Sequence, residues 1–144
     1  MTAVLIHATT VQLGAHGVLI FGASGSGKSD LALRLIGDGA LLVSDDQTLL
    51  ALKDGRLIAS APATIAGRIE ARGIGIVRAP QIESAIVRLA VELTAAPLER
   101  MPEPSAWSPP GVAAAPQVPL VLLTPFEPSA LLKLRMALLA VTEA

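Results

Sequence analysis

Cysteine is absent from the 144-residue chain, and aromatic side chains make up only 2% of it. Without cysteine there is neither a disulfide framework nor a thiolate metal site, and the composition suits a reducing compartment. Charged residues are also few, at 16%, and the formal net charge is −1. Because lysine and arginine do not cluster, the sequence lacks the basic surface that would hold a nucleic-acid backbone.

Segments suited to a membrane are lacking as well. The first ten residues carry no basic residue before their short apolar run, unlike a secretory signal. The longest uncharged stretch, residues 104–126, contains six prolines, which would leave backbone groups without hydrogen bonds in lipid. Hydrophobic residues make up 52% of the chain, enough for the core of one domain over residues 1–144. We therefore expect a cytoplasmic protein with neither a membrane nor a nucleic-acid partner.

Short aliphatic and β-branched runs are separated by turn signals along most of the chain. They predict strands over residues 4–6, 17–21, 41–44, 48–52, 57–61, 87–93 and 118–123, with a loop and then a short strand over 73–77. Asp54-Gly55 predicts a hairpin turn. Apolar spacing predicts a helix over residues 28–37 and a last helix, capped by Ser129, that runs to about Val141. The expected class is α/β with a mixed, partly antiparallel sheet, and residues 94–117 form a proline- and alanine-rich connection within it.

A glycine-rich sequence, Gly-Ala-Ser-Gly-Ser-Gly-Lys-Ser, directly follows the strand expected over residues 17–21. It fits the Walker A pattern G-x-x-x-x-G-K-[ST] at every position and precedes an amphipathic helix, as a P-loop requires. Glycines let successive backbone N–H groups surround phosphate oxygens, and the helix adds its positive N-terminal end. Lys28 is expected to reach the β- and γ-phosphates of a nucleotide, and the Ser29 hydroxyl to ligate magnesium. The residues of this predicted phosphate site are Gly22, Ala23, Ser24, Gly25, Ser26, Gly27, Lys28 and Ser29.

Two adjacent carboxylates, Asp45 and Asp46, follow the strand expected over residues 41–44. Binding sites of open α/β sheets form outside the carboxyl ends of the strands. If this strand lies near the strand over 17–21 and parallel to it, both aspartates arrive beside the terminal phosphate. One carboxylate would then act on magnesium, and the other would accept a proton from an attacking hydroxyl. The residues alone leave open which aspartate has which role.

Four features together resemble a known family. His7 lies 21 residues before Lys28, and Asp46 lies 18 residues after it. Residues 42–46 read Leu-Val-Ser-Asp-Asp, and residues 69–76 read Ile-Glu-Ala-Arg-Gly-Ile-Gly-Ile. Over about residues 5–93, this pattern resembles the C-terminal catalytic domain of the bacterial HPr kinase/phosphorylase family. That family uses ATP to phosphorylate a serine of the phosphocarrier protein HPr, and it can reverse the reaction with inorganic phosphate.

The resemblance implies a role for several residues. ATP and Mg²⁺ would be the cofactors, and Ser29 and Glu70 would be the metal ligands. Asp46 would be the general base of the forward reaction and the general acid of the reverse reaction. The resemblance also implies active-site roles for His7, Lys28 and Arg72, and Arg100 is the nearest match to a late catalytic arginine of the family. Asp45 is expected in the site because it stands beside Asp46. The fold would be the P-loop fold shared by HPr kinase and phosphoenolpyruvate carboxykinase, and the assembly a homo-oligomer, by resemblance a hexamer.

The sequence also departs from the family pattern. Arg100 lies in Glu-Arg-Met-Pro, where the family has an Asp-Arg-Leu-Gly-like segment, and the family's later arginine-bearing loop has no counterpart. We therefore expect an ATP- and Mg²⁺-dependent serine kinase acting on an HPr-like partner, with weak or absent phosphorylase activity. The alternatives are a kinase of a small metabolite and a nucleotide-binding regulatory module without turnover.

Overall fold

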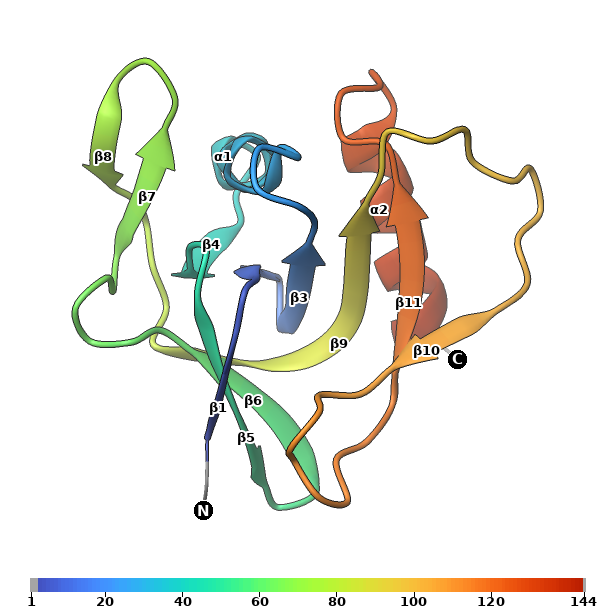
Figure 1. The fold of residues 1–144 in the computed structure, drawn as a ribbon, viewed down its shortest axis with the longest axis horizontal. Helices are drawn as coiled ribbons and strands as arrows, with labels where there is room; N and C mark the ends of the chain where they lie inside the picture. Colours follow the sequence, from blue (N-terminus) through green and yellow to red (C-terminus); the bar gives the residue numbers. More distant parts are fainter. Residues whose placement is uncertain (1–2, 144) are drawn as a thin grey trace.

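Strand β9 (Ser84–Leu93) is the longest strand and curves through the middle of the molecule (Figure 1). The computed structural model describes residues 3–143. The other strands are β1 (Val4–Ile6), β2 (Thr9–Leu13), β3 (His16–Phe21), β4 (Leu41–Ser44), β5 (Thr48–Lys53), β6 (Arg56–Ser60), β7 (Arg68–Ala71), β8 (Gly75–Arg78), β10 (Ser105–Trp107) and β11 (Val118–Leu123). The helices are α1 (Lys28–Gly37) and α2 (Ala130–Thr142). Neither of these helices is long and apolar enough to cross a membrane.

One mixed sheet contains most of the strands and curls around the bend of β9. Its order is β1-β5-β6-β9-β3-β2-β4, and β11 also pairs with β9 and with β10. Strands β3, β9 and β11 run parallel, whereas the remaining pairs in this sheet are antiparallel. The first residues of β9 pair with β6, and its later residues lie between β3 and β11. The expected α/β class with a mixed, partly antiparallel sheet is confirmed.

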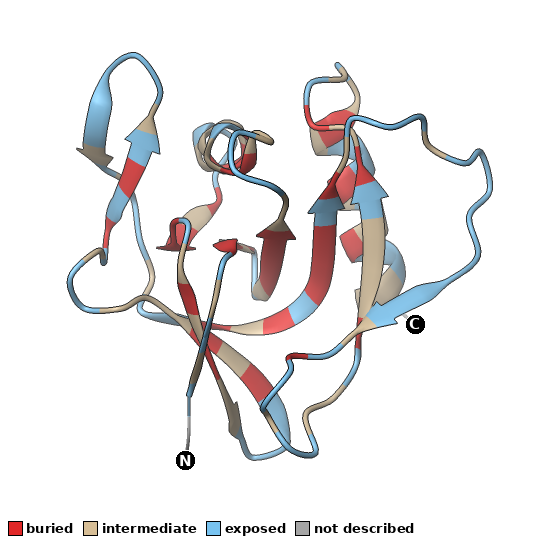
Figure 2. Cartoon of the chain, in the orientation of Figure 1, coloured by how far each residue is buried: buried red, intermediate tan, exposed pale blue. Residues whose placement is uncertain are grey.

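The sheet packs hydrophobic side chains on both of its faces. Because successive side chains of a strand point to opposite faces, Val18 and Ile20 of β3 pack toward the helices and Leu19 packs on the other side. Helix α1 contributes Leu31 and Leu35 to the helical side. Figure 2 shows buried residues along β3 and the later part of β9, which hold the site described below in place.

Strand β4, which the two aspartates follow, runs parallel to β3 as expected, with one strand between them. Strand β2 is antiparallel to both β3 and β4, so β4 runs in the same direction as β3. The carboxyl ends of β3 and β4 therefore meet at the same edge of the sheet. Strand β2 itself was not predicted, although its last four residues, Thr-Val-Gln-Leu, alternate between polar and apolar side chains.

Other expectations need correction. Residues 68–78 form a complete hairpin, β7–β8, in which Glu70 pairs with Ile76, whereas only its second strand was predicted. The connection over residues 94–117 contains the unpredicted strand β10, whose Trp107 ring lies 4.8 Å from the Phe21 ring between centroids. Ser129 occupies the N-cap position of α2, but its side chain makes no capping hydrogen bond, so the prediction of a side-chain cap was wrong.

Candidate active site

Residues 22–27, the glycine loop, join the end of β3 to the start of α1. The loop turns tightly, because the backbone N–H of Ser26 donates to the carbonyl oxygen of Ala23 over 2.9 Å. Gly27 precedes α1 with φ of 104°, and a Cβ there would lie 2.8 Å from the Phe126 ring. Only glycine fits this conformation and this space. The first N–H groups of a helix have no partners within the helix, so this end of α1 presents donors to an anion.

Lys28, the first residue of α1, brings a cation to the glycine loop. Its side chain is buried, and Nζ donates to the carbonyl oxygens of Gly22 over 2.9 Å and of Ala23 over 3.3 Å. The ammonium group therefore rests on the carbonyl side of the loop while it still faces the cavity. An anion that binds the loop would meet this positive charge directly.

Asp45 connects three other segments at the end of β4. Its side chain is only 8% exposed, and Oδ1 accepts hydrogen bonds from Ser29 Oγ over 2.6 Å and from Thr9 Oγ1 over 3.0 Å. Oδ2 accepts a bond from the backbone N–H of Glu70 over 3.0 Å. This carboxylate therefore joins β2, α1 and β7, and it holds the Ser29 hydroxyl in one position. Thr9 was not among the residues predicted from the sequence, although its polar side chain within a buried strand is a signal that would have indicated it.

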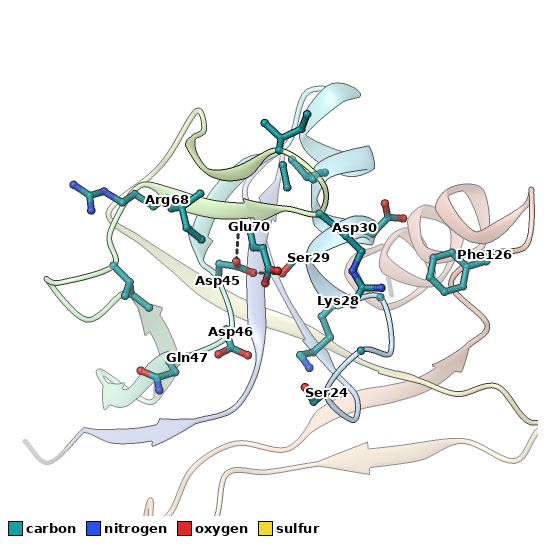
Figure 3. A pocket seen from close by; sticks show the side chains of 18 of the residues that line it. Ser24, Lys28, Ser29, Asp30, Asp45, Asp46, Gln47, Arg68, Glu70 and Phe126 are labelled. Carbon is teal, nitrogen blue, oxygen red and sulfur yellow. Dashed lines mark hydrogen bonds between the residues drawn. The ribbon is translucent and has the colours of Figure 1, made fainter.

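Asp46 has a different environment although it is the next residue. It is exposed at the cavity and has φ of 66°, a left-handed conformation that aspartate tolerates better than most residues. Its backbone N–H donates to Thr9 Oγ1 over 3.0 Å, which fixes the turn. Figure 3 shows its carboxylate pointing into the open space beside Lys28, separate from the Asp45 and Ser29 pair. This carboxylate is free to meet a second molecule.

The β7–β8 hairpin supplies a further wall of the site. Glu70 and Arg72 line the cavity together with Arg68, which was not among the predicted site residues. Figure 3 shows the Glu70 side chain extending toward Asp45 and Ser29. The Glu70 carboxylate and the Ser29 hydroxyl are oxygen ligands, and Mg²⁺ commonly binds through one or two carboxylates together with substrate phosphates. The residues present therefore fit a magnesium ion. No cluster of three or more His, Asp or Glu side chains suited to a metal occurs among residues 3–143.

A single cavity of about 930 Å³ joins these parts. It is large enough for a nucleotide and part of a second substrate. Its polar and charged lining consists of Ser24, Lys28, Ser29, Asp30, Asp45, Asp46, Gln47, Thr64, Arg68, Glu70 and Arg72. Its remaining lining residues are Gly25, Gly27, Leu33, Ile65, Ala71, Ile74, Ile76 and Phe126. Lys28, the Ser29 hydroxyl and the carboxylates of Asp46 and Glu70 thus face one space.

The sequence matches a known protein family. The family model described as the HPr Serine kinase C-terminal domain matches residues 1–93. The chain belongs to this family. The HPr kinase/phosphorylase of Clostridium botulinum is 43% identical over 77 residues, which are 54% of this chain and 25% of that protein. The HPr kinase/phosphorylase of Malacoplasma penetrans is 32% identical over 95 residues, 61% of this chain and 32% of that protein. The chain thus matches about a quarter to a third of the length of these curated relatives.

The solved structure of the Hpr(Ser) kinase/phosphatase from Coxiella burnetii resembles the whole fold. It matches with a TM-score of 0.81 and 30% sequence identity, and the match covers 97% of this chain and 99% of that chain. The likeness therefore continues past residue 93 into β10, β11 and α2. These relatives are named as kinases, so the HPr serine kinase family is a family of phosphotransferases.

Two residues that the resemblance to HPr kinases implied do not line the cavity. His7 is exposed in the bend between β1 and β2, two residues before Thr9. Arg100 is exposed in the segment between β9 and β10. The other residues expected in the site line this one cavity, apart from Gly22, Ala23 and Ser26, which belong to the glycine loop. Catalytic roles for His7 and Arg100 stay predictions.

Proposed function

We propose that this member of the HPr serine kinase family is an ATP- and Mg²⁺-dependent kinase that phosphorylates a serine of an HPr-like phosphocarrier protein. The observation that carries the proposal is the single cavity in which the glycine loop, the Asp45–Ser29 hydrogen bond and the free carboxylate of Asp46 meet. In this proposal the glycine loop is a P-loop that binds the phosphates of ATP.

Each residue of the cavity then has a physical task. Lys28 and the backbone N–H groups at the start of α1 would bind the β- and γ-phosphates. Ser29 and Glu70 would hold Mg²⁺, and Asp45 would keep the Ser29 hydroxyl in place for it. When bound, Mg²⁺ would neutralise charge that develops on the phosphoryl oxygens. Asp46 would orient the serine hydroxyl of the acceptor protein and accept its proton as the oxygen attacks in line.

The test is transfer of label from γ-labelled ATP to purified HPr, with Mg²⁺ present. We expect label on HPr and none on an HPr variant in which the acceptor serine is alanine. Lys28→Met should abolish the transfer, whereas Lys53→Met, which removes an exposed lysine from the β5–β6 hairpin, should not. Because Lys28 is buried and hydrogen-bonded, a thermal melt must show that the Lys28 variant remains folded.

The two alternatives give different results in the same assay. A small-metabolite kinase would hydrolyse or transfer the γ-phosphate in the presence of a cell extract but would leave HPr unlabelled. A regulatory module would bind ATP without transferring its phosphate to any acceptor. Either outcome would contradict the proposal.

A further inference from the structure

Phe126 is an exposed aromatic residue on the wall of the cavity. It lies in the segment between β11 and α2, and 68% of its surface is exposed although it lines the same cavity as the glycine loop. Its ring atoms lie close to Gly27, where a Cβ would be 2.8 Å away. The edge of the ring is therefore fixed against the glycine loop, while most of its surface stays open to solvent.

Arg34 of α1 holds the Phe126 segment in place. Its guanidinium donates to the Pro125 carbonyl oxygen over 2.5 Å and to Asp30 Oδ2 over 3.1 Å. The same group lies over the Phe126 ring, 5.9 Å from the centroid, within the range of a cation–π contact. Two elements far apart in the sequence thus fix the orientation of an exposed ring, which is unexpected for a surface phenylalanine without a partner.

The position of Phe126 relative to the carboxylates indicates what it meets. Figure 3 shows Phe126 on one side of Lys28, and Asp45, Asp46 and Glu70 on the other side. In phosphoryl transfer the attacking oxygen, the phosphorus and the leaving oxygen are roughly in line. If the acceptor hydroxyl approaches from the Asp46 side, the leaving nucleoside diphosphate extends toward the opposite side, where Phe126 lies.

We propose that Phe126 is the surface on which the base of the bound nucleotide stacks, and that Arg34 is a positioning residue for its ring. The inference rests on the proposed function, because it assumes that the glycine loop binds nucleotide phosphates. Stacking on an aromatic ring tolerates different bases, since every base has a π face. The site should therefore accept purine nucleotides of both kinds, with ATP and GTP bound at similar strength.

The other apolar residues of the cavity offer a rival wall. Ile74 and Ile76 on the β7–β8 hairpin are 80% and 66% exposed. They lie beside Glu70 on the hairpin that forms the acidic side of the cavity, where the acceptor protein would approach. We therefore assign the base to Phe126, and the variant Ile74→Ala tests whether the hairpin contributes to binding of the base.

The experiment compares two ligands that share phosphates but differ in the base. The dissociation constants of Mg²⁺-ATP and Mg²⁺-tripolyphosphate are measured by calorimetry for the wild type and for Phe126→Ala, Phe126→Trp, Arg34→Met and Ile74→Ala. Phe126→Ala should weaken ATP binding by about tenfold to a hundredfold, typical for the loss of one stacked base. Its tripolyphosphate binding should change less than about twofold, and Phe126→Trp should keep both affinities. Arg34→Met should shift the ratio of the two constants in the same direction by a smaller factor, and Ile74→Ala should leave it unchanged.

Each contrary result has its own meaning. If Phe126→Ala weakens the binding of ATP and of tripolyphosphate equally, the ring supports the glycine loop and the stacking role is overturned. Unchanged ATP binding with a raised KM for HPr would place the protein substrate on Phe126 and would also overturn it. A selective loss of ATP binding in Ile74→Ala alone would move the base to the hairpin. If the wild type binds neither ligand, the proposed function itself falls and this inference falls with it.

Discussion

Asp45 and Asp46 are neighbours in the chain, yet they should respond differently to the same substitution. Asp45 is buried and accepts three hydrogen bonds, whereas Asp46 is exposed and its carboxylate points into the cavity. Replacing a buried acceptor with an amide places an N–H₂ group against donors, which costs stability. Replacing an exposed carboxylate removes its charge and its ability to accept a proton, and changes little else.

We expect Asp46→Asn to lose most phosphoryl transfer and to keep its affinity for ATP. The loss of a general base typically lowers the rate by about 10²–10⁴-fold, and asparagine adds no bulk. The measurement is kcat for HPr phosphorylation beside the dissociation constant of Mg²⁺-ATP. Asp45→Asn is the matched comparison, and it should lower the melting temperature and the affinity for Mg²⁺-ATP. Loss of ATP binding in a folded Asp46→Asn variant would instead make Asp46 a metal ligand or a structural residue.

Glu70→Gln should raise the concentration of Mg²⁺ needed for half-maximal activity. The substitution turns a charged ligand into a neutral one, and Mg²⁺ prefers carboxylates. Activity is measured over a magnesium titration at fixed total ATP. Glu83→Gln, which changes an exposed glutamate just before β9, serves as the control and should give the wild-type curve. A wild-type curve for Glu70→Gln would contradict its role as a ligand.

At the scale of elements, β2 connects the phosphate side of the site to the carboxylate side. This strand lies between β3 and β4, and its Thr9 hydroxyl donates to Asp45 and accepts from the N–H of Asp46. The fully buried position of Thr9 means that no water replaces a lost hydrogen bond easily. The geometry of both aspartates therefore depends on one hydroxyl.

Thr9→Val should destabilise the protein by about 1–3 kcal/mol and also impair its activity. It keeps the shape of the side chain but leaves a buried carboxylate and a backbone N–H each short of a partner. Thr10→Val is the matched control, because Thr10 is equally buried but bonds only to the Thr48 hydroxyl. Both variants should melt earlier than the wild type, and only Thr9→Val should change the magnesium dependence and kcat. Equal kinetics for the two variants would show that Thr9 acts through stability alone.

The elements predicted correctly from the sequence are those whose sequence patterns are local and do not depend on residues far away in the chain. The glycine loop with its following helix and the Asp54-Gly55 turn carry such signals, and the helix over residues 28–37 coincides with α1. Strand β2 has only a short alternating segment, Thr-Val-Gln-Leu, and β7 has the weakly apolar sequence Arg-Ile-Glu-Ala, so neither carries a strong strand signal. The difference between the buried Asp45 and the exposed Asp46 depends on Thr9 and on the backbone of Glu70, which approach from other segments. Such contacts form only in the folded chain, so the residue pattern alone did not distinguish the two aspartates.

At the scale of the whole molecule, apolar surface indicates self-association. The mean hydropathy is +0.62, and Leu132, Met136 and Leu139 are each more than half exposed on one face of α2. We predict a homo-oligomer, which sedimentation at micromolar concentration would detect. Leu132→Glu with Leu139→Glu should reduce the association if α2 takes part in it. A monomer over the whole concentration range would contradict the prediction.

The charge of the cavity as a whole bears on the direction of the reaction. Reversal by phosphate requires inorganic phosphate and phosphoserine in one pocket, and positive charge must offset the repulsion between the two anions. The cationic side chains that line the cavity are Lys28, Arg68 and Arg72, and the carboxylates are Asp30, Asp45, Asp46 and Glu70, so there are three cations and four anions. Arg100 lies outside this lining, and the segment from Thr124 to Ser129 contains no arginine.

We therefore expect phosphate-dependent dephosphorylation to be weak or absent while the forward reaction proceeds. ATP would bring its own Mg²⁺ and would bind backbone N–H groups as well as Lys28, so the forward reaction does not depend on further cations. Serine-phosphorylated HPr is incubated with millimolar phosphate and without ATP, and pyrophosphate release is followed. Release as fast as the forward reaction would show that Arg68 and Arg72, or a residue of a second copy, supply enough positive charge. The variants Arg72→Met and Arg68→Met would then distinguish these sources. Loss of pyrophosphate release in either variant would assign the positive charge to the β7–β8 hairpin. Unchanged release in both variants would assign it to a residue of a second copy.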